Sequence, residues 1–411
     1  MPVDFLTEKQ KLNYGKFSGQ PNDMQLARYF HVDENDMAFI AKRRGAKNRF
    51  GFALQLISLR FLGTFISDLS LIPINVKSFI ALQLSLNDMS ILANYGQRET
   101  TKREHAALIR KEYGYHEFGD FPWFFGLGRL LYSRAWLSNQ RPSLMFDGAT
   151  SWLIQTKVIL PGATTMLRFI SQIRQRADSR LWHRLSSLPS DEQRRKLETL
   201  LQVPEGRRIS QFDLYRQSPS TVSGPSFNES ANRYTKLKEF GMQALNLSKI
   251  PPVRLKNLAR YAGLISMHKI ARMPDSKRIA LLVAFAKTYE TIALDDTVDV
   301  LDLLIKGIAR TAKKIGQKKR LRTIKDLDKS ALILADICAL ILKDETQDSS
   351  LRETIFSRVS KDKLTASVAT INDLARPDDD NFHDEMVQQY GRVRQFLPSL
   401  LQNIKLKALS H

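Results

Sequence analysis

The sequence predicts an all-α protein, built of tandem modules that resemble helix-turn-helix units and followed by a longer helical bundle. Apolar residues recur at helical spacing from one end of the chain to the other. The alternation typical of strands is nearly absent, and only residues 71–74 and 158–161 read as short extended segments. At 411 residues the chain exceeds what one core usually supports, so we expect two or three domains.

Composition breaks divide the predicted helices into successive parts. The clearest break is the polar segment 217–226, rich in Ser, Pro and Gly, which is typical of a linker. A weaker break lies at 188–191, where Ser190 or Asp191 would cap the following helix. We therefore expect five successive parts: a first helical module over residues 1–75, a second helical module over 76–120, a helix-turn-helix module over 121–188, a helical connector with linker over 189–226, and a helical bundle with a basic face over 227–411.

The excess of positive charge indicates which kinds of partner the chain binds. Against 42 Asp and Glu the chain carries 63 Lys and Arg, a net charge of +21, which indicates nucleic acid first and an anionic membrane surface second. No run approaches the roughly 18 to 20 apolar residues that cross a bilayer, and the first residues do not resemble a secretion signal. The chain has a single cysteine, Cys338, in a core-like helical segment. A single cysteine excludes disulfides within the chain and fits a reducing cytoplasm.

The first predicted contact with nucleic acid is a basic turn that runs into an apolar helix over residues 50–65. The turn, residues 42–49, carries five cations and no carboxylate, and a helix start already favours a phosphate there. The helix is apolar around most of its circumference, with Arg49 and Arg60 on its one polar edge, so we expect it to be a buried anchor. The predicted phosphate ligands are Arg43, Arg44, Lys47 and Arg49.

A weaker copy of this pattern follows. Asn35-Asp36-Met37, then Ala41, Arg49 and Ala53, is echoed by Asn87-Asp88-Met89, then Ala93, Arg103 and Ala107. If the echo is a duplication, Lys102 and Arg103 are phosphate ligands of a second module; the alternative is two unrelated helical hairpins.

The strongest helix-turn-helix candidate spans residues 151–176. A helix closes at 151–157, Val158 to Gly162 form a turn, and a second helix begins at Ala163. Met166, Leu167, Ile170 and Ile173 share its inward stripe, which leaves Ser171 and Gln175 outward together with the predicted base-reading residues Thr164, Thr165, Arg168 and Gln172. The alternative is a surface helical hairpin with an ordinary solvated face.

The later helices add two more basic surfaces. In 254–263, Arg254 and Asn257 are predicted to face outward and contact bases. Pro274 would open a helix that ends at Leu294, and Asp295 and Asp296 would cap the next, which turns Ile305, Ile308, Ala312 and Ile315 inward. Residues 303–325 hold nine cations and no acid, and each phosphate contact there would add about 0.9 to the salt slope of duplex binding. The predicted phosphate ligands are Lys313, Lys314, Lys318, Lys319, Arg320 and Arg322.

Nothing in the sequence predicts an active site. Acids cluster at 295–302 and 378–385, but a helix start explains the first cluster and a loop with an N-cap explains the second. No Walker loop, nucleophile elbow, zinc spacing or Cys/His pair is present in the sequence. We therefore expect a binder, with no catalytic residue, no metal site, no cofactor and no small-molecule substrate.

Several collinear segments resemble the N-terminal region of the Tn-three family transposases, the enzymes of replicative, cointegrate-forming bacterial transposons. The resemblance extends over nearly the whole chain and is carried by residues 1–7, 25–31, 48–65, 95–98, 160–165, 254–263, 314–322 and 378–386.

This resemblance implies a role in DNA transposition, through binding of the transposon's terminal inverted repeats. Family members are about twice as long or more, and their Mg²⁺-dependent Asp-Asp-Glu site lies in a C-terminal domain that nothing in this chain matches, so we expect no strand cleavage from it. The implied partner is double-stranded DNA, with a possible homodimer and no membrane, in the bacterial cytoplasm beside nucleoid or plasmid. The alternatives are a truncated regulator that occupies the ends and inhibits the full-length enzyme, or a helical dimerisation module.

Overall fold

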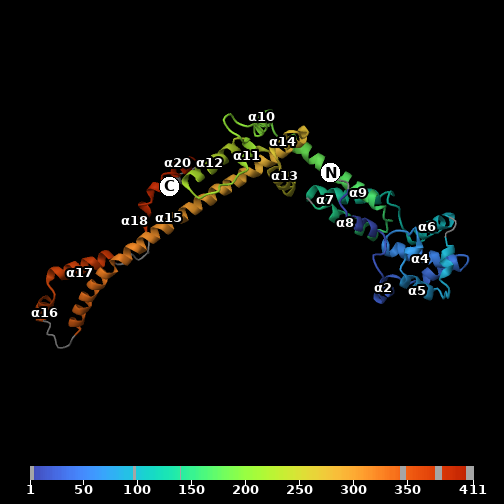
Figure 1. Cartoon of the computed structure of the whole chain (residues 1–411), viewed down its shortest axis with the longest axis horizontal. Coiled ribbons are helices and arrows are strands. Elements are labelled where there is room, and N and C mark those ends of the chain that lie inside the picture. The colour runs from blue at the N-terminus through green and yellow to red at the C-terminus, as the bar shows by residue number, and fades with distance from the viewer. Residues whose placement is uncertain (1–3, 96–98, 139, 343–348, 375–381, 404–411) are drawn as a thin grey trace, which may run out of the picture. The chain divides into compact units, whose positions relative to one another are not determined.

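The computed structural model describes residues 4–95, 99–138, 140–342, 349–374 and 382–403 (Figure 1). Their secondary structure is helical, so the all-α prediction is confirmed. Among these residues the one β-type pairing is an isolated bridge between His116 and Val158. The other predicted extended segment, 71–74, instead joins two helices. No helix in the described ranges is long and apolar enough to span a membrane.

The chain folds into two compact units. Unit 1 comprises Met1–Ser190 and Leu245–Ala284, and unit 2 comprises Asp191–Ala244 and Phe285–His411. The weak sequence break at Ser190 is therefore a boundary between units, whereas segment 217–226 lies inside unit 2. Its Ser223 side chain accepts a hydrogen bond from the Ser226 amide at the start of α12. The Ser, Pro and Gly residues of this segment thus begin a helix and do not link domains.

The first core of unit 1 surrounds helix α4. Its residues Phe50 to Leu59 are all buried, which confirms the predicted buried anchor. Ile80, Tyr95 and Ile109 belong to the same core, so the boundary predicted between residues 75 and 76 falls within a single hydrophobic cluster. The elements that form this part are α1 (Glu8–Asn13), α2 (Asp23–Tyr29), α3 (Glu34–Ala41), α4 (Ala46–Leu62), η1 (Leu69–Leu71), α5 (Ile74–Gln83), η2 (Ser90–Asn94) and α6 (Glu99–Tyr113).

The two segments of the sequence echo fold differently. Asp36 lies within α3 and is buried. Its counterpart Asp88 is exposed and accepts a hydrogen bond from the Ser90 amide before the short 3₁₀ helix η2. The similar residues Asn35-Asp36-Met37 and Asn87-Asp88-Met89 therefore adopt different local structures. Residues 96–98, which fall within the second copy, lie outside the described residues.

The second core of unit 1 is a three-helix layer. It consists of α7 (Trp123–Leu137), α8 (Pro142–Gln155) and α9 (Ala163–Ser186), which pack against one another (Figure 1). The limits of α8 and α9 agree with the predicted helices on either side of the turn. Met166, Leu167 and Ile170 are buried and Ile173 packs against the same core, as their spacing predicts. Helices α13 (Pro252–Leu264) and α14 (Met267–Ala271) and the start of α15 complete the unit.

Unit 2 is built along the rest of α15 (Asp275–Ile341), a single helix of 67 residues. The predicted helix break at Asp295 and Asp296 is wrong. No Gly or Pro interrupts residues 275–306, and the Asp296 carboxylate lies 2.5 Å from Arg233 of α12, so this acid pairs with another helix and caps nothing. The other elements are α10 (Asp191–Thr199), α11 (Gln211–Tyr215), α12 (Gly224–Lys238), η3 (Met242–Ala244), α16 (Leu351–Arg358), α17 (Lys361–Leu374), α18 (His383–Val387), α19 (Tyr390–Val393) and α20 (Leu397–Asn403).

The core of unit 2 corrects the inward stripe predicted for α15. Val300, Leu304 and Ile308 are buried together with Phe227 of α12 and Phe396. Of the residues predicted inward, Ile308 and Ala312 are buried, whereas Ile305 and Ile315 are 49% and 37% exposed. The buried stripe runs through Val300, Leu304, Ile308 and Ala312, so the prediction holds for two of its four residues. Cys338, placed in a core-like segment by the sequence, is also exposed.

Candidate nucleic-acid interface

The turn that precedes α9 is fixed by backbone hydrogen bonds to two other parts of unit 1. The His116 amide donates to the Lys157 carbonyl and the Ile159 amide donates to the His116 carbonyl, each over 2.9 Å. The Leu160 amide donates to the carbonyl of Gly63, the residue that ends α4, also over 2.9 Å. Backbone that is held on two sides presents the first turn of α9 in one orientation, which a reading helix requires.

Gly63 is suited to this close approach. Its φ of +75° lies in the left-handed region, and a Cβ atom added there would come within 2.9 Å of Leu160 Cγ. A side chain at residue 63 would therefore be strained and would also push the turn away.

The outward face of α9 carries the predicted base-reading residues. Met166, Leu167 and Ile170 are buried, and Thr164, Thr165, Arg168 and Gln172 are exposed. Gln175 is exposed as predicted, whereas Ser171 is half-buried. The first turn of α9 contains no acidic residue, so nothing on this turn repels a phosphate or competes for Arg168. These side chains can donate to and accept from base edges, and the threonine methyls can contact thymine.

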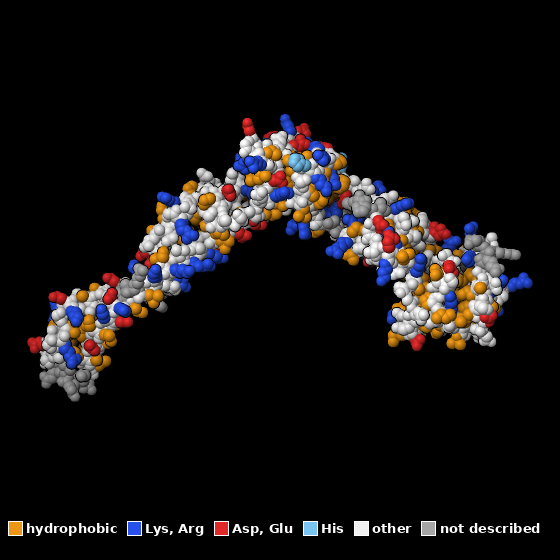
Figure 2. Space-filling model, in the orientation of Figure 1, with side chains coloured by type: hydrophobic (Ala, Val, Ile, Leu, Met, Phe, Trp, Pro, Cys, Tyr) orange, Lys and Arg blue, Asp and Glu red, His pale blue; other side chains and the backbone are white. Residues whose placement is uncertain are grey.

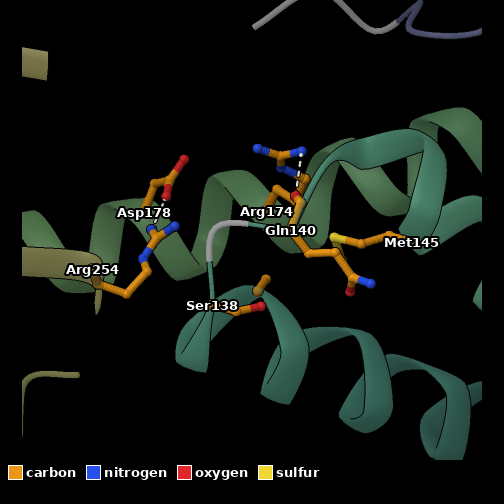
Figure 3. A pocket seen from close by; sticks show the side chains of 7 residues that line it. Ser138, Gln140, Met145, Arg174, Asp178 and Arg254 are labelled. Atoms are coloured by element: carbon orange, nitrogen blue, oxygen red, sulfur yellow. Dashed lines mark hydrogen bonds and ion pairs between the residues drawn. The ribbon is translucent and has the colours of Figure 1, made fainter. Parts of the chain in front are cut away.

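Arg254 does not face outward, and the prediction that it contacts bases is wrong in this structure. Its side chain is only 8% exposed and forms an ion pair with Asp178 of α9 (Figure 3). The periodicity of α13 could not reveal this, because the partner carboxylate comes from a helix 76 residues earlier in the chain. Arg254 therefore links α13 to α9, the helix whose exposed face carries the predicted base-reading residues. Asn257, the second predicted contact on α13, is half-buried.

Arg174 shares this polar cluster. It lines the same pocket as Asp178 and Arg254, and its Nη1 lies 3.5 Å from the Gln140 carbonyl oxygen (Figure 3). Burial lowers the pKa of Arg174; the charge of Asp178 opposes this shift, and that of the nearby Arg254 adds to it. The cluster packs α9 against its neighbours and points away from the exposed face of that helix.

The cations at the start of α4 lie in two different environments, one exposed to solvent and one packed on aromatic rings. Arg44, Lys47 and Arg49 are exposed; Gly45, the N-cap residue of α4, makes no side-chain cap, and the first turn of the helix contains no acid. Arg43 is half-buried, with its guanidinium carbon 5.3 Å from the Phe39 ring centroid and 5.2 Å from that of Phe52. Arg43 therefore packs on the aromatic core, while the three exposed cations remain available to a phosphate.

Arg60, on the predicted polar edge of α4, is a structural residue. Its two terminal nitrogens each donate to the buried Asp36 carboxylate over 2.6 Å, and the Tyr113 hydroxyl donates over 2.7 Å. Burial alone would raise the pKa of Asp36, but these hydrogen bonds outweigh it and hold the pKa below its ordinary value. The pKa of Tyr113 is raised, first by burial and then by its bond to Asp36.

The remaining predicted phosphate ligands lie on α6 and α15. Lys102 is half-buried and donates to the Ser67 carbonyl over 3.3 Å. Arg103 is exposed and interacts with other groups of the chain. Lys313, Lys314, Lys318 and Lys319 are exposed on α15, where cationic side chains gather along one edge of the helix (Figure 2). Arg320 and Arg322 belong to the helical backbone of α15, and their side chains lie outside the described part of the chain.

Two acids of the first acidic cluster have cationic partners. Asp296 pairs with Arg233, and Asp302 lies 2.7 Å from Lys306, one turn along α15. Residues 378–381 of the second cluster lie outside the described residues. Within the described ranges, no three His, Cys, Asp or Glu residues gather closely enough to hold a metal ion.

Two exposed aromatic residues of unit 1 are not among the predicted contact residues. Phe121 and Phe125, at the start of α7, are 80% and 62% exposed. The signal is visible in the sequence, since residues 121–125 read Phe-Pro-Trp-Phe-Phe, and so many aromatic residues around a proline exceed what one helix turn can bury on a single side.

Known proteins match the chain along nearly its whole length. Residues 5–173 match the family described as "Domain of unknown function (DUF4158)". The chain is 56% identical to the transposase for transposon gamma-delta of Escherichia coli (strain K12), over 99% of this chain and 41% of that protein. It is 27% identical to the transposase for transposon Tn501 of Pseudomonas aeruginosa, over 93% of this chain and 38% of that protein.

A more distant relative matches a comparable share of this chain. The transposase for transposon Tn1546 of Enterococcus faecium is 24% identical, over 92% of this chain and 38% of that protein. The chain thus spans about two fifths of the length of the relatives it matches. Along nearly its whole length, it is therefore similar to part of a series of transposon transposases.

Proposed function

We propose that this chain is a DNA-recognition part of a Tn-three family transposase and binds the terminal inverted repeats of its transposon during DNA transposition. The observation that carries the proposal is the exposed face of α9, with Thr164, Thr165, Arg168 and Gln172 on a helix whose preceding turn is held by Gly63 and His116. The net charge of +21 and the similarity to transposases support the same conclusion.

In this proposal, α9 lies in the major groove, which is wide enough to admit a helix. Arg168 forks onto a guanine, Gln172 onto an adenine, and the two threonines contact a phosphate or a thymine methyl. The two residues that read hydrogen-bond patterns are four positions apart, about one helical turn, so they meet neighbouring base pairs.

Phosphate contacts position this reading helix. The exposed cations at the start of α4 contribute to them, and the exposed lysines of α15 supply more. Arg43 supports the basic turn from inside, because its guanidinium lies over the Phe39 and Phe52 rings. The buried Arg254 contributes by holding α13 to α9 and touches no base.

We propose further that strand cleavage and transfer belong to a part of the transposase other than this chain. The Asp296 and Asp302 carboxylates lie beside Arg233 and Lys306, so these cations account for both acids without a metal ion. Incubating the chain with a supercoiled plasmid that carries a transposon end, with and without Mg²⁺, should leave the plasmid uncut. Nicking that is abolished by Asp299→Asn would overturn this part of the proposal.

DNA recognition is tested by footprinting the chain on a duplex that carries one terminal inverted repeat of transposon gamma-delta. We expect protection across the repeat and a specific affinity at least about a thousandfold above that for a scrambled duplex of equal length. Equal affinity for the two duplexes, both falling alike with salt, would reduce the proposal to non-specific binding.

A homodimer is a second proposal, favoured by the exposed apolar residues of α15. Leu303, Leu321 and Leu332 are 50%, 68% and 65% exposed. Large apolar side chains at such exposure favour association with another helix. Light scattering of the free chain should give the mass of a dimer, and a monomer mass at micromolar concentration would exclude this association without DNA.

A further inference from the structure

An apolar surface borders the proposed reading face of α9. The rings of Phe121 and Phe125 lie edge to face with centroids 5.9 Å apart, and both are largely exposed. Phe125 also contacts Phe124, whose ring centroid is 4.9 Å from that of Phe169 on α9. The exposed pair is thus connected through one ring to the reading helix.

Helices α7 and α9 lie side by side and run in the same direction. Phe124 meets Phe169 near the start of both helices, and farther along Arg180 of α9 donates to the Tyr132 hydroxyl over 3.1 Å. Near the ends, the Arg184 guanidinium lies over the Trp136 ring at 5.4 Å. The order of these contacts fixes the relative direction of the two helices.

Phe125 and the reading residues lie on the same surface of this helix pair. Leu127 and Leu131 of α7 and Met166 and Ile170 of α9 all enter one core. The exposed residues of each helix therefore point to the opposite side. Phe125 and Arg129 one turn later lie there on α7, beside Arg168 and Gln172 on α9.

We propose that Phe121 and Phe125 form an apolar contact with the same DNA that α9 reads, against the deoxyribose rings and base edges that border its groove. This inference rests on the proposed function. The surrounding charge favours DNA as the occupant, because exposed Arg129 and Arg168 flank the two rings. The acid beside them, Asp120, already accepts a hydrogen bond from the Glu117 amide over 2.7 Å. A phenylalanine at a DNA surface can contact thymine methyls or wedge against bases.

The test is binding of the full chain to the gamma-delta repeat and to a scrambled duplex across a range of salt concentrations. We expect the double variant Phe121→Ala with Phe125→Ala to bind the repeat about tenfold more weakly. Its salt slope should equal that of the wild type, because no phosphate contact is lost. Phe121→Leu with Phe125→Leu should recover most of the affinity. Leu144→Ala, which removes another half-exposed apolar side chain from the same three-helix layer, should bind like the wild type.

The outcomes separate this inference from the proposed function. If the wild-type chain does not prefer the repeat over scrambled DNA, the proposed function fails. If the wild type prefers the repeat but the double alanine variant binds it equally well, the aromatic contact alone is refuted. A loss of affinity that Leu144→Ala reproduces, or one with a lowered salt slope, would also overturn it. Both aromatic side chains are exposed, so circular dichroism should show an unchanged fold.

Discussion

Helices α9 and α13 look alike in the sequence and differ in the structure. Each follows a proline-containing turn, and each carries an arginine and an amide side chain at positions that periodicity turns outward. On α9, Arg168 and Gln172 are exposed; on α13, Arg254 is buried against Asp178. Periodicity shows which side of a helix faces away from its own core. A second element can still cover that side, and a buried carboxylate on it, here Asp178, then pairs with the arginine.

The pair formed by Arg60 and Asp36 shows the same effect in the first core. Arg60 lies on the polar edge of an otherwise apolar helix, where it reads as a phosphate ligand or a solvated cation. Its guanidinium in fact meets a carboxylate from α3 that is only 1% exposed. The arginines of this chain therefore divide into those that hold helices together and those that remain available to DNA.

Arg254→Ala should have the largest effect on the stability of the fold. Removing one member of a buried ion pair leaves the Asp178 carboxylate without a partner, so the free energy of unfolding should fall by about 3–5 kcal/mol. Urea unfolding measures this change. Arg260→Ala, at an exposed position of the same helix, should change it by less than about 0.5 kcal/mol. Unchanged stability of the Arg254 variant with altered base preference would restore Arg254 as a reading residue.

Tyr113→Phe probes the second buried pair and should cost about 1.5–3 kcal/mol at neutral pH, because the hydroxyl donates to an ionised carboxylate. The folded-state pKa of Asp36 lies below its ordinary value of 3.8. Its ionised form therefore stabilises the fold above that value, and the contribution is lost as pH falls through the folded pKa.

The difference in unfolding free energy between wild type and Tyr113→Phe should accordingly shrink below pH 3.8. Urea unfolding over a series of pH values measures it. Tyr115→Phe serves as the control, because burial is the main cause of its raised pKa and no loss of a carboxylate bond is expected. A Tyr113→Phe effect that stays constant with pH would contradict a hydrogen bond to ionised Asp36.

Gly63→Ala tests whether the turn before α9 is held from the first core. A residue with a Cβ is strained at a φ of +75° and would meet Leu160, so we expect a loss of about 1–3 kcal/mol in stability. Gly162→Ala, immediately before α9, has nothing within 4 Å of the added Cβ and should change stability by less than about 1 kcal/mol. Equal effects of the two substitutions would show that Gly63 does not position the turn.

The smallest expected effect concerns the exposed cations of α4. Lys47→Ala should weaken binding to the repeat and to scrambled DNA alike, and should lower the salt slope of duplex binding by about 0.9. Titrations by fluorescence anisotropy at several salt concentrations measure both quantities. Lys9→Ala, an exposed lysine outside the proposed contacts, is the control. A selective loss for the repeat alone would place Lys47 among the reading residues.

Local signals predicted much of this fold. The helix limits around Gly162, the burial of Phe50 to Leu59 and the exposure of Arg168 all follow from spacing within one segment. What the sequence could not show depends on partners far away in the chain. Asp178 captures Arg254, Arg233 pairs with Asp296 and removes the expected helix break, and segment 217–226 starts a helix inside unit 2. Periodicity describes one helix at a time and is blind to these contacts.

The most direct test of the account compares Arg168→Ala with Arg254→Ala in their preference among repeats that carry single base-pair changes, with the protein kept folded. We predict that Arg168→Ala loses about 1–3 kcal/mol of discrimination at one base pair, and that folded Arg254→Ala keeps the wild-type preference at every position. Unchanged preference in the Arg168 variant would contradict the assignment of α9 as the reading helix.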